Sequence, residues 1–310
     1  TVLSLRGDAE YRLVNDAVAD GNKVRVDLTD ADNVGEIELT GQGEYELIET
    51  RTDIDATIAE GPLTVSTREA EVDEITVTAG DNRLTVNALN SGDTITVAAA
   101  ELTDDFEDFE VSGDGTINGN DSSNDSYELV ASGSGDVTVN SLGADLDASA
   151  LEGELNVVLL SDGLFGSQIN DVDILLGEAN ATIDTLDGSA ATDVTLDASA
   201  TAAGSTVTLD GDGDAVVFGV NDAVTIDAQT EGFSGALEVL TDSLSVGETV
   251  TVNTGSEATI IRGSGGAVTV DATSLVDSST NDDLSLTGDS AFTVSGLSAD
   301  ADASAATGEV

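Results

Sequence analysis

Short apolar segments recur along almost the whole chain and restrict it to a β-rich fold. Many of them alternate apolar and polar residues, as in KVRVDL and TITVAA, and most are bounded by Gly, Asn, Asp or Ser. Alternation with a period of two puts every second side chain on one face of an extended strand. The segments follow one another at intervals of about 8 to 13 residues, and only 99–109 shows a weak helical period. The pattern therefore predicts an all-β protein built of short strands.

The composition favours a regular, repetitive core. Aromatic residues make up 3% of the 310 residues, and Cys, Met, Trp and His are absent. Without large side chains to fill irregular space, small and β-branched residues must pack in regular layers. We therefore predict an elongated, right-handed parallel β-solenoid, in which the strands around residues 194, 207, 224, 250 and 268 stack. The alternative is a row of immunoglobulin-like β-sandwiches, which the scarcity of Trp, Tyr and Pro disfavours.

The charge is extreme and unevenly distributed. The formal net charge is -54, from 62 acidic and 8 basic residues, and Arg262 is the only base beyond residue 83. This asymmetry predicts an N-terminal β segment over 1–128, with mixed charge and an acidic loop, followed by cation-poor solenoid repeats over 129–310. So many carboxylates repel one another unless concentrated salt screens them or divalent cations bind. The sequence leaves both explanations open.

Nucleic acid and anionic membranes are poor partners for such a chain. Binding to phosphate groups needs clustered Lys and Arg, and Lys23 is the only lysine. No apolar run of about 18 residues is present, so we expect no membrane insertion. Chains without Cys are common among secreted surface proteins, which favours an extracellular, cell-surface location.

The sequence also contains a less regular repeat with a longer period than the strand spacing. Its core is an apolar residue, Asp, Ala and a polar residue, and copies begin at Leu146, Leu196, Ile226 and Val270, with a fragment at Ala301. With Gly-Asp turns such as SGSGDVTVN and LDGDGDAVVFG, these copies resemble the repeats-in-toxin class of β-solenoids, particularly bacterial surface-layer proteins of that type, over about 129–310. The resemblance implies calcium bound between successive coils. The sequence departs from the nonapeptide of that class, because GDGDAVVFG lacks the residue between the second glycine and the aspartate, and no tandem run of nonapeptides occurs.

Alternating aspartates are the candidate metal ligands. Asp210, Asp212 and Asp214 begin like an EF-hand loop, but Ala215 stands where that loop needs Gly and Asn221 where it needs Glu. An EF-hand is therefore rejected, and a calcium-binding turn competes with a solvated acidic turn. Similar pairs, each expected to share one strand face, are Asp145 and Asp147, Asp171 and Asp173, and Asp30 and Asp32.

Two further kinds of candidate site occur. The segment 101–114 is the densest acidic cluster, and it is interpreted either as a hard-cation site or as a solvated loop anchored by its phenylalanines. Three asparagines fit the N-glycosylation pattern Asn-x-Ser/Thr, namely Asn120, Asn124 and Asn180. Pairs of Thr spaced Thr-x-Thr, such as Thr206 and Thr208, could form threonine ladders as in ice-binding solenoids, but they are interpreted as ordinary β-propensity.

Catalysis has few groups to work with. The chain has no His or Cys, and no nucleophile-elbow or Walker-type motif is present, so only carboxylates remain. We therefore expect no enzyme but a structural subunit of an extracellular surface layer or filament. It would assemble from copies of itself with cation support, most simply calcium, and a cell-surface glycan is a second class of partner. The alternatives are an adhesin stalk or, less favoured, a polysaccharide-acting β-helix enzyme.

Overall fold

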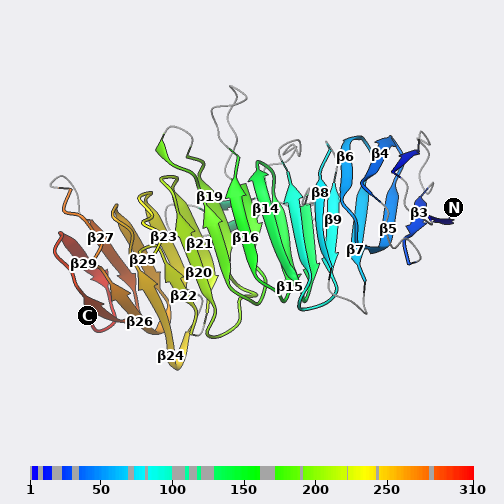
Figure 1. Ribbon diagram of the computed structural model, residues 1–310. Coiled ribbons are helices and arrows are strands. Elements are labelled where there is room, and N and C mark those ends of the chain that lie inside the picture. Colours follow the sequence, from blue (N-terminus) through cyan, green and yellow to red (C-terminus); the bar gives the residue numbers. More distant parts are fainter. Residues whose placement is uncertain are drawn as a thin grey trace. The chain divides into compact units, whose positions relative to one another are not determined.

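A computed structural model shows strands and turns but no α-helix among the residues it describes (Figure 1). Within that part of the chain, no helix is long and apolar enough to cross a membrane. The described residues are 2–5, 10–15, 23–29, 35–68, 73–80, 83–99, 109–111, 117–119, 129–160, 172–188, 191–221, 223–241, 244–278 and 283–310.

Contacts divide the chain into two compact units. The first comprises 1–105 and 126–160, and the second comprises 106–125 and 161–310. The predicted division at residue 128 rests on charge, not on contacts, and stays a prediction. In the first unit the ladders continue from β9 (Leu84–Ala88) to β13 (Leu129–Gly133) and from β10 (Thr94–Ala98) to β14 (Asp136–Leu142). The chain between β10 and β13 is therefore an insertion in the sequence between two successive coils.

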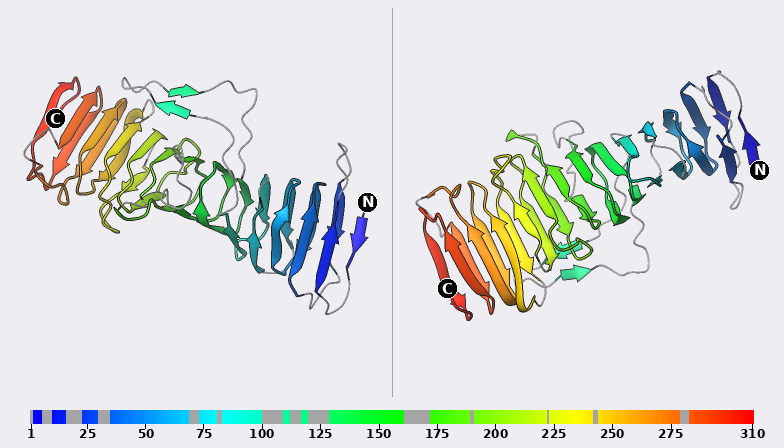
Figure 2. Two further views of the ribbon diagram at one scale, coloured as in Figure 1. Left: turned by 90° about the horizontal axis from the view of Figure 1, so that it is seen from above. Right: turned by 60° about the horizontal axis from the view of Figure 1, so that its bottom comes forward.

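The first unit has two parallel sheets, and consecutive strands alternate between them (Figure 2). One sheet has the order β1 (Val2–Ser4), β3 (Val24–Asp27), β5 (Tyr45–Thr50), β7 (Leu63–Thr67), β9 (Leu84–Ala88), β13 (Leu129–Gly133) and β15 (Leu146–Leu151). The other has the order β2 (Tyr11–Val14), β4 (Ile37–Gly41), β6 (Ile54–Ala59), β8 (Glu74–Thr78), β10 (Thr94–Ala98), β14 (Asp136–Leu142) and β16 (Leu155–Leu159).

The second unit repeats this arrangement. One sheet has the order β17 (Val172–Leu175), β19 (Val194–Asp197), β21 (Ala215–Val220), β23 (Leu237–Thr241), β25 (Thr259–Gly263), β27 (Leu284–Gly288) and β29 (Ala301–Ala306). The other has the order β18 (Ala181–Asp184), β20 (Thr206–Asp210), β22 (Thr225–Asp227), β24 (Leu244–Asn253), β26 (Gly265–Asp271) and β28 (Ala291–Ser295). A short antiparallel pair, β11 (Phe109–Val111) and β12 (Ile117–Gly119), is also present.

The interior is built of aliphatic columns. In the second unit Leu196, Val217, Val239, Ile261 and Leu286 stand at equivalent positions of five successive strands and are all buried. Each coil thus places a similar aliphatic side chain above the one before it, and the few buried aromatic residues of this unit, Phe218, Phe233 and Phe292, lie outside this column. The composition predicted this kind of packing.

The prediction of a parallel β-solenoid is confirmed. Apart from the antiparallel pair β11 and β12, the strands pair in parallel, each with the next strand of its own sheet along the chain. An immunoglobulin-like sandwich would need antiparallel pairs. One detail of the predicted stack is wrong. The strands containing Val207, Ile226, Val250 and Val268 lie in one sheet, whereas Val194 lies in the other, paired with Ala215. Each coil contains two strands, so strands that follow one another in the chain lie in different sheets. The spacing of the strands in the sequence does not show this.

Candidate functional site: carboxylates at the coil corners

Aspartates of the repeated block bind their own turns. The Oδ1 atoms of Asp147, Asp197, Asp271 and Asp302 accept hydrogen bonds from the backbone N–H of the Ser or Thr two residues later, at 2.9, 2.8, 3.0 and 2.7 Å. The hydroxyl of that residue also donates to Oδ1 at Asp147, at 2.6 Å. These are Asx turns, which offer the backbone an alternative to the sheet ladder. The repeat is therefore a device for bending the chain.

The same turn has two effects on the strand that carries it. At Asp147 and Asp302 the pairing shifts by one residue just after the aspartate, which is a β-bulge, and the same happens at Asp55 in β6. At Asp197 and Asp271 the strand ends at the aspartate. A bulge re-aims the chain and increases its twist, so both outcomes form a corner.

A second group of carboxylates joins one coil to the next. Asp214 N donates to Asp193 Oδ1 at 2.8 Å, and Ala236 N donates to Asp214 Oδ1 at 2.8 Å. In the first unit Asp136 Oδ1 accepts from Glu154 N at 2.9 Å. Backbone N–H groups at corners lie outside the regular ladder and need such acceptors. Each of these side chains therefore pins a corner to its neighbour one coil away.

The three aspartates of the predicted calcium turn each accept a hydrogen bond. Asp210 Oδ1 accepts from Gly211 N at 2.8 Å, and Asp214 binds Ala236 N as described. Asp212 Oδ2 accepts from Gly188 N at 2.6 Å, and its Oδ1 accepts from the Ser234 hydroxyl. The Ser234 hydroxyl, followed by the Gly188 N–H, holds the pKa of Asp212 below its ordinary value. Donors from other turns thus hold Asp212 and Asp214, whereas Asp210 accepts from the next residue of its own turn.

The other predicted ligands do not form a common site. Asp145 is buried, with 2% of its surface exposed, whereas Asp147 is half-buried, so they do not share one exposed face. Asp173 is 3% exposed and pairs with Thr195 in the ladder. The predicted site residues that lie outside the described residues are Asp30, Asp32, Asn120, Asn124, Asp171 and, from the acidic cluster 101–114, the acids of 101–108 and Asp114.

No metal centre is assembled in the described part of the chain. No group of three or more carboxylates there is arranged to hold a metal ion. A calcium ion takes 6 to 8 oxygen ligands, and several of the oxygens that the sequence offered already accept hydrogen bonds. Calcium binding stays a prediction. The hydrogen bonds are another way in which the protein stabilises neighbouring aspartates.

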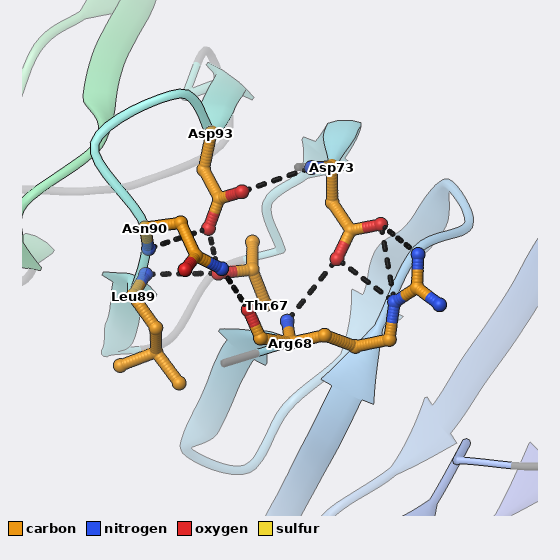
Figure 3. Close-up of polar contacts among 6 residues, drawn as sticks. All are labelled: Thr67, Arg68, Asp73, Leu89, Asn90 and Asp93. Carbon is orange, nitrogen blue, oxygen red and sulfur yellow. Dashed lines mark hydrogen bonds and ion pairs between the residues drawn. The ribbon is translucent and has the colours of Figure 1, made fainter. Parts of the chain in front are cut away.

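A buried carboxylate cluster was missed by sequence reasoning (Figure 3). Asp93 is completely buried and accepts hydrogen bonds from Asp73 N and Asn90 N, both at 2.9 Å, and from the Thr67 hydroxyl. Asp73 in turn binds Arg68, with 2.6 Å between Nη2 and Oδ1. The residues come from the corners that follow β7 and β9 and precede β8 and β10. The cluster fastens two coils of the first unit together.

Arg12, Lys23 and Arg262 pair with acids one coil away. Arg12 lies 3.3 Å from Glu38, and Lys23 lies 2.9 Å from Glu44, which raises the pKa of Lys23. In the second unit Arg262 Nε lies 2.5 Å from Glu238 Oε1. Such cross-strand pairs contribute modestly to stability. The charge asymmetry along the chain therefore matches a difference between the outer faces of the coils. Ion pairs join neighbouring strands in the first coils, whereas hydroxyl and carboxylate groups occupy the outer positions in the later coils.

Threonines form a column on the outer face of the second unit. They stand in register on five neighbouring strands, and none is fully buried. Paired Thr side chains on neighbouring strands stabilise a sheet, so this column is a threonine ladder, and the interpretation as β-propensity stays a prediction. The members are Thr206, Thr225, Thr251, Thr269 and Thr293.

Asp227 provides a test of the corner hydrogen bonds through pH. Burial raises the pKa of Asp227, but hydrogen bonds from Thr230 Oγ1 at 2.5 Å and from Gln229 N and Thr230 N at 3.1 Å outweigh it and lower the pKa overall. A lowered folded-state pKa contributes stability above the unfolded pKa, about 3.9, which is lost as pH falls through the folded pKa.

We expect Asp227→Asn to be less stable than the native protein at pH 7, by up to about 1 kcal/mol for this partly exposed group. The difference should shrink as pH falls from 4 to 2. Urea unfolding followed by circular dichroism in about 1 M salt, which screens the general repulsion, measures it. Thr230→Val, which removes the hydroxyl donor, should lose part of the same pH dependence. A difference that stays constant from pH 7 to pH 2 would contradict this account.

Comparisons with known proteins give no match, whether to protein-family models, curated proteins or solved structures. The resemblance to repeats-in-toxin proteins stays an expectation. Because solenoids support many unrelated functions, a functional proposal has to come from the contacts described above.

Proposed function

We propose that this chain is a structural subunit of an extracellular surface layer or filament, which joins to copies of itself and has no catalytic activity. The observation that supports this most is the use made of the carboxylates. At Asp147, Asp197, Asp212, Asp214 and Asp93 the acidic oxygens accept hydrogen bonds from backbone or hydroxyl groups of the coils. Aspartates, which act as catalytic groups or metal ligands in other proteins, stabilise the coils of the solenoid here.

The outer surface supports a role in assembly. A solenoid presents long columns of equivalent side chains, which repeat at the strand spacing of about 4.8 Å and offer regular surfaces for lateral contact. The excess of acids opposes contact between copies at low ionic strength, because the net charge is -54. Cations are therefore part of the proposal, either as calcium bridges between acidic columns or as a screening atmosphere.

The experiment is sedimentation velocity combined with electron microscopy of the purified chain. Raising NaCl from 0.1 to 1 M shortens the screening length from about 10 to about 3 Å, so we expect monomers to associate into ordered assemblies. A second series holds ionic strength constant and exchanges part of the NaCl for CaCl2, followed by a chelator. Assembly that the chelator reverses supports calcium bridges, and assembly that ignores it supports screening.

Two outcomes would contradict the proposal. The first is a chain that stays monomeric at every salt and calcium concentration while its circular dichroism shows it to be folded. The second is turnover of a polysaccharide that Asp210→Asn or Asp214→Asn abolishes. The matched control is Asp302→Asn. This variant changes a carboxylate that accepts a hydrogen bond from Ser304 N in its own turn, and we expect it to leave both readouts unchanged.

A further inference from the structure

Asn180 occupies a corner position that aspartate fills elsewhere. Its Oδ1 accepts a hydrogen bond from Thr206 N, one coil on, at 2.9 Å. Asp193, Asp214 and Asp136 make the same kind of bond to the backbone of the next coil. An acceptor oxygen is all that this corner requires, and a carboxylate supplies it. The hydrogen bond from Thr206 N therefore leaves the amide nitrogen of Asn180 available for another reaction.

That nitrogen is also accessible. Asn180 is exposed, and its Nδ2 makes no hydrogen bond to any residue that the structure describes. Because the Oδ1 atom is held toward Thr206 N, the Nδ2 atom on the other arm of the carboxamide is directed away from that bond. Ala181 is buried at the start of β18, and Thr182 is half-buried at the next outward position. Asn180 and Thr182 thus lie on the outer side of the strand.

We propose that Asn180 is an N-glycosylation site, the acceptor of the sequence Asn180-Ala181-Thr182. In the reaction Nδ2 forms a bond to the anomeric carbon of a saccharide carried on a lipid diphosphate. The bond from that carbon to the diphosphate oxygen breaks, the lipid diphosphate leaves, and the Nδ2 proton passes to a base of the transferring enzyme. The product is a secondary amide that keeps its carbonyl oxygen. The hydrogen bond from Thr206 N therefore survives the modification.

The site fits the fold for a second reason. A glycan is bulky and must leave the surface without displacing packed atoms. Asn180 precedes β18 instead of lying within it, so the attached sugar interrupts no ladder bond of that strand. The proposal rests on the proposed extracellular location, because lipid-linked saccharides are transferred on the export route. It does not depend on self-assembly.

The test is peptide mass mapping of the protein isolated from the cells that produce it. Cleavage before aspartate yields a fragment of residues 173–183, which contains Asn180 as its only acceptor. We expect most of this fragment to carry an added saccharide mass. Asn180→Asp keeps the Oδ1 acceptor and should abolish the added mass while leaving the unfolding temperature of the unmodified protein unchanged.

A matched pair at Thr182 separates sequon recognition from structure. Thr182→Ser keeps the hydroxyl of the sequon and should retain the saccharide, whereas Thr182→Val keeps the shape and should lose it. An unmodified fragment 173–183 from the producing cells would overturn the proposal, as would an added mass that persists in Thr182→Val. Either result leaves the sedimentation and microscopy outcome untouched, so failure here is distinct from failure of the assembly proposal.

Discussion

Asp93→Ala is expected to lower the free energy of unfolding of the first unit by about 3 to 5 kcal/mol. The carboxylate is completely buried and accepts from Asp73 N, Asn90 N and the Thr67 hydroxyl. Alanine leaves two buried donors, the Thr67 hydroxyl and Asp73 N, and the part-buried Asn90 N without their acceptor. Each buried donor left unpaired costs about 1 to 3 kcal/mol. Water that enters the space left behind would recover part of this. Urea unfolding followed by circular dichroism measures the loss.

Two variants keep this test interpretable. Asp93→Asn preserves the volume but turns an N–H group toward one of the donors, so we expect an intermediate loss of about 1 to 3 kcal/mol. Asp136→Ala is the matched control on the neighbouring coil, because that side chain accepts a single N–H at a half-buried corner and should cost at most about 1 kcal/mol. Hydrogen exchange should localise the Asp93 effect to the coils around 63–98. Equal losses at Asp93 and Asp136 would contradict the assigned role of burial.

The strands and their parallel stacking could be predicted because they depend on local patterns. Alternation of apolar and polar residues, as in TITVAA, fixes which side chains face the core, and a shortage of aromatic residues demands regular layers. The sheet to which a strand belongs was harder to predict. Val194 was placed in the wrong stack because nothing in a single strand shows how many strands complete one coil.

The role of the aspartates could not be predicted because it depends on contacts between coils. From the sequence, Asp210, Asp212 and Asp214 are three negative charges on alternate positions. The structure adds Gly188 N, Ser234 Oγ and Ala236 N, which come from other turns and are not marked by any local motif. The repeated apolar-Asp-Ala-polar block was recognised as a repeat, but its effect, an Asx turn that ends or bulges a strand, emerges only when the pairing register is known.

The cluster around Asp93 was invisible for a related reason. Thr67 is the last residue of β7, and Arg68, Asp73 and Asn90 are ordinary residues of corners. Thr67 and Asp73 reach the Asp93 carboxylate only because the next coil places it beside them. The sequence Asn90-Ser91-Gly92-Asp93 does indicate a turn, in which Asn90 N reaches the Asp93 carboxylate. The Asp93 carboxylate is buried because a neighbouring coil packs against it. Neither the composition nor the residue spacing of the sequence predicts that contact.

Gly211→Ala is expected to destabilise the second unit by about 2 to 5 kcal/mol. Gly211 has a φ of +93°, a conformation that costs an L-residue about 1 to 2 kcal/mol. Its Cβ would also lie 2.6 Å from Leu186 O and from Thr185 Oγ1. Overpacking of that kind adds about 1 to 3 kcal/mol. Thr185 is buried, and its hydroxyl accepts from Gly213 N at 3.0 Å and donates to Asp210 O at 2.9 Å, so it cannot move without breaking the corner.

Gly204→Ala separates the two causes, because Gly204 has the same φ of +93° but its Cβ would meet no atom within 4 Å. We expect this control to lose only the conformational part, about 1 to 2 kcal/mol. The difference between the two variants, measured by urea unfolding and by hydrogen exchange at residues 184–214, isolates the close approach of one coil to the next at the acidic turn. If the corner is held by Gly188 N, Ser234 Oγ and Ala236 N, Gly211→Ala should also expose the turn around Asp212 to exchange. Equal losses of unfolding free energy in the two variants would mean that the corner adjusts to the added Cβ at little cost. The hydrogen bonds between coils would then not hold the aspartates in place.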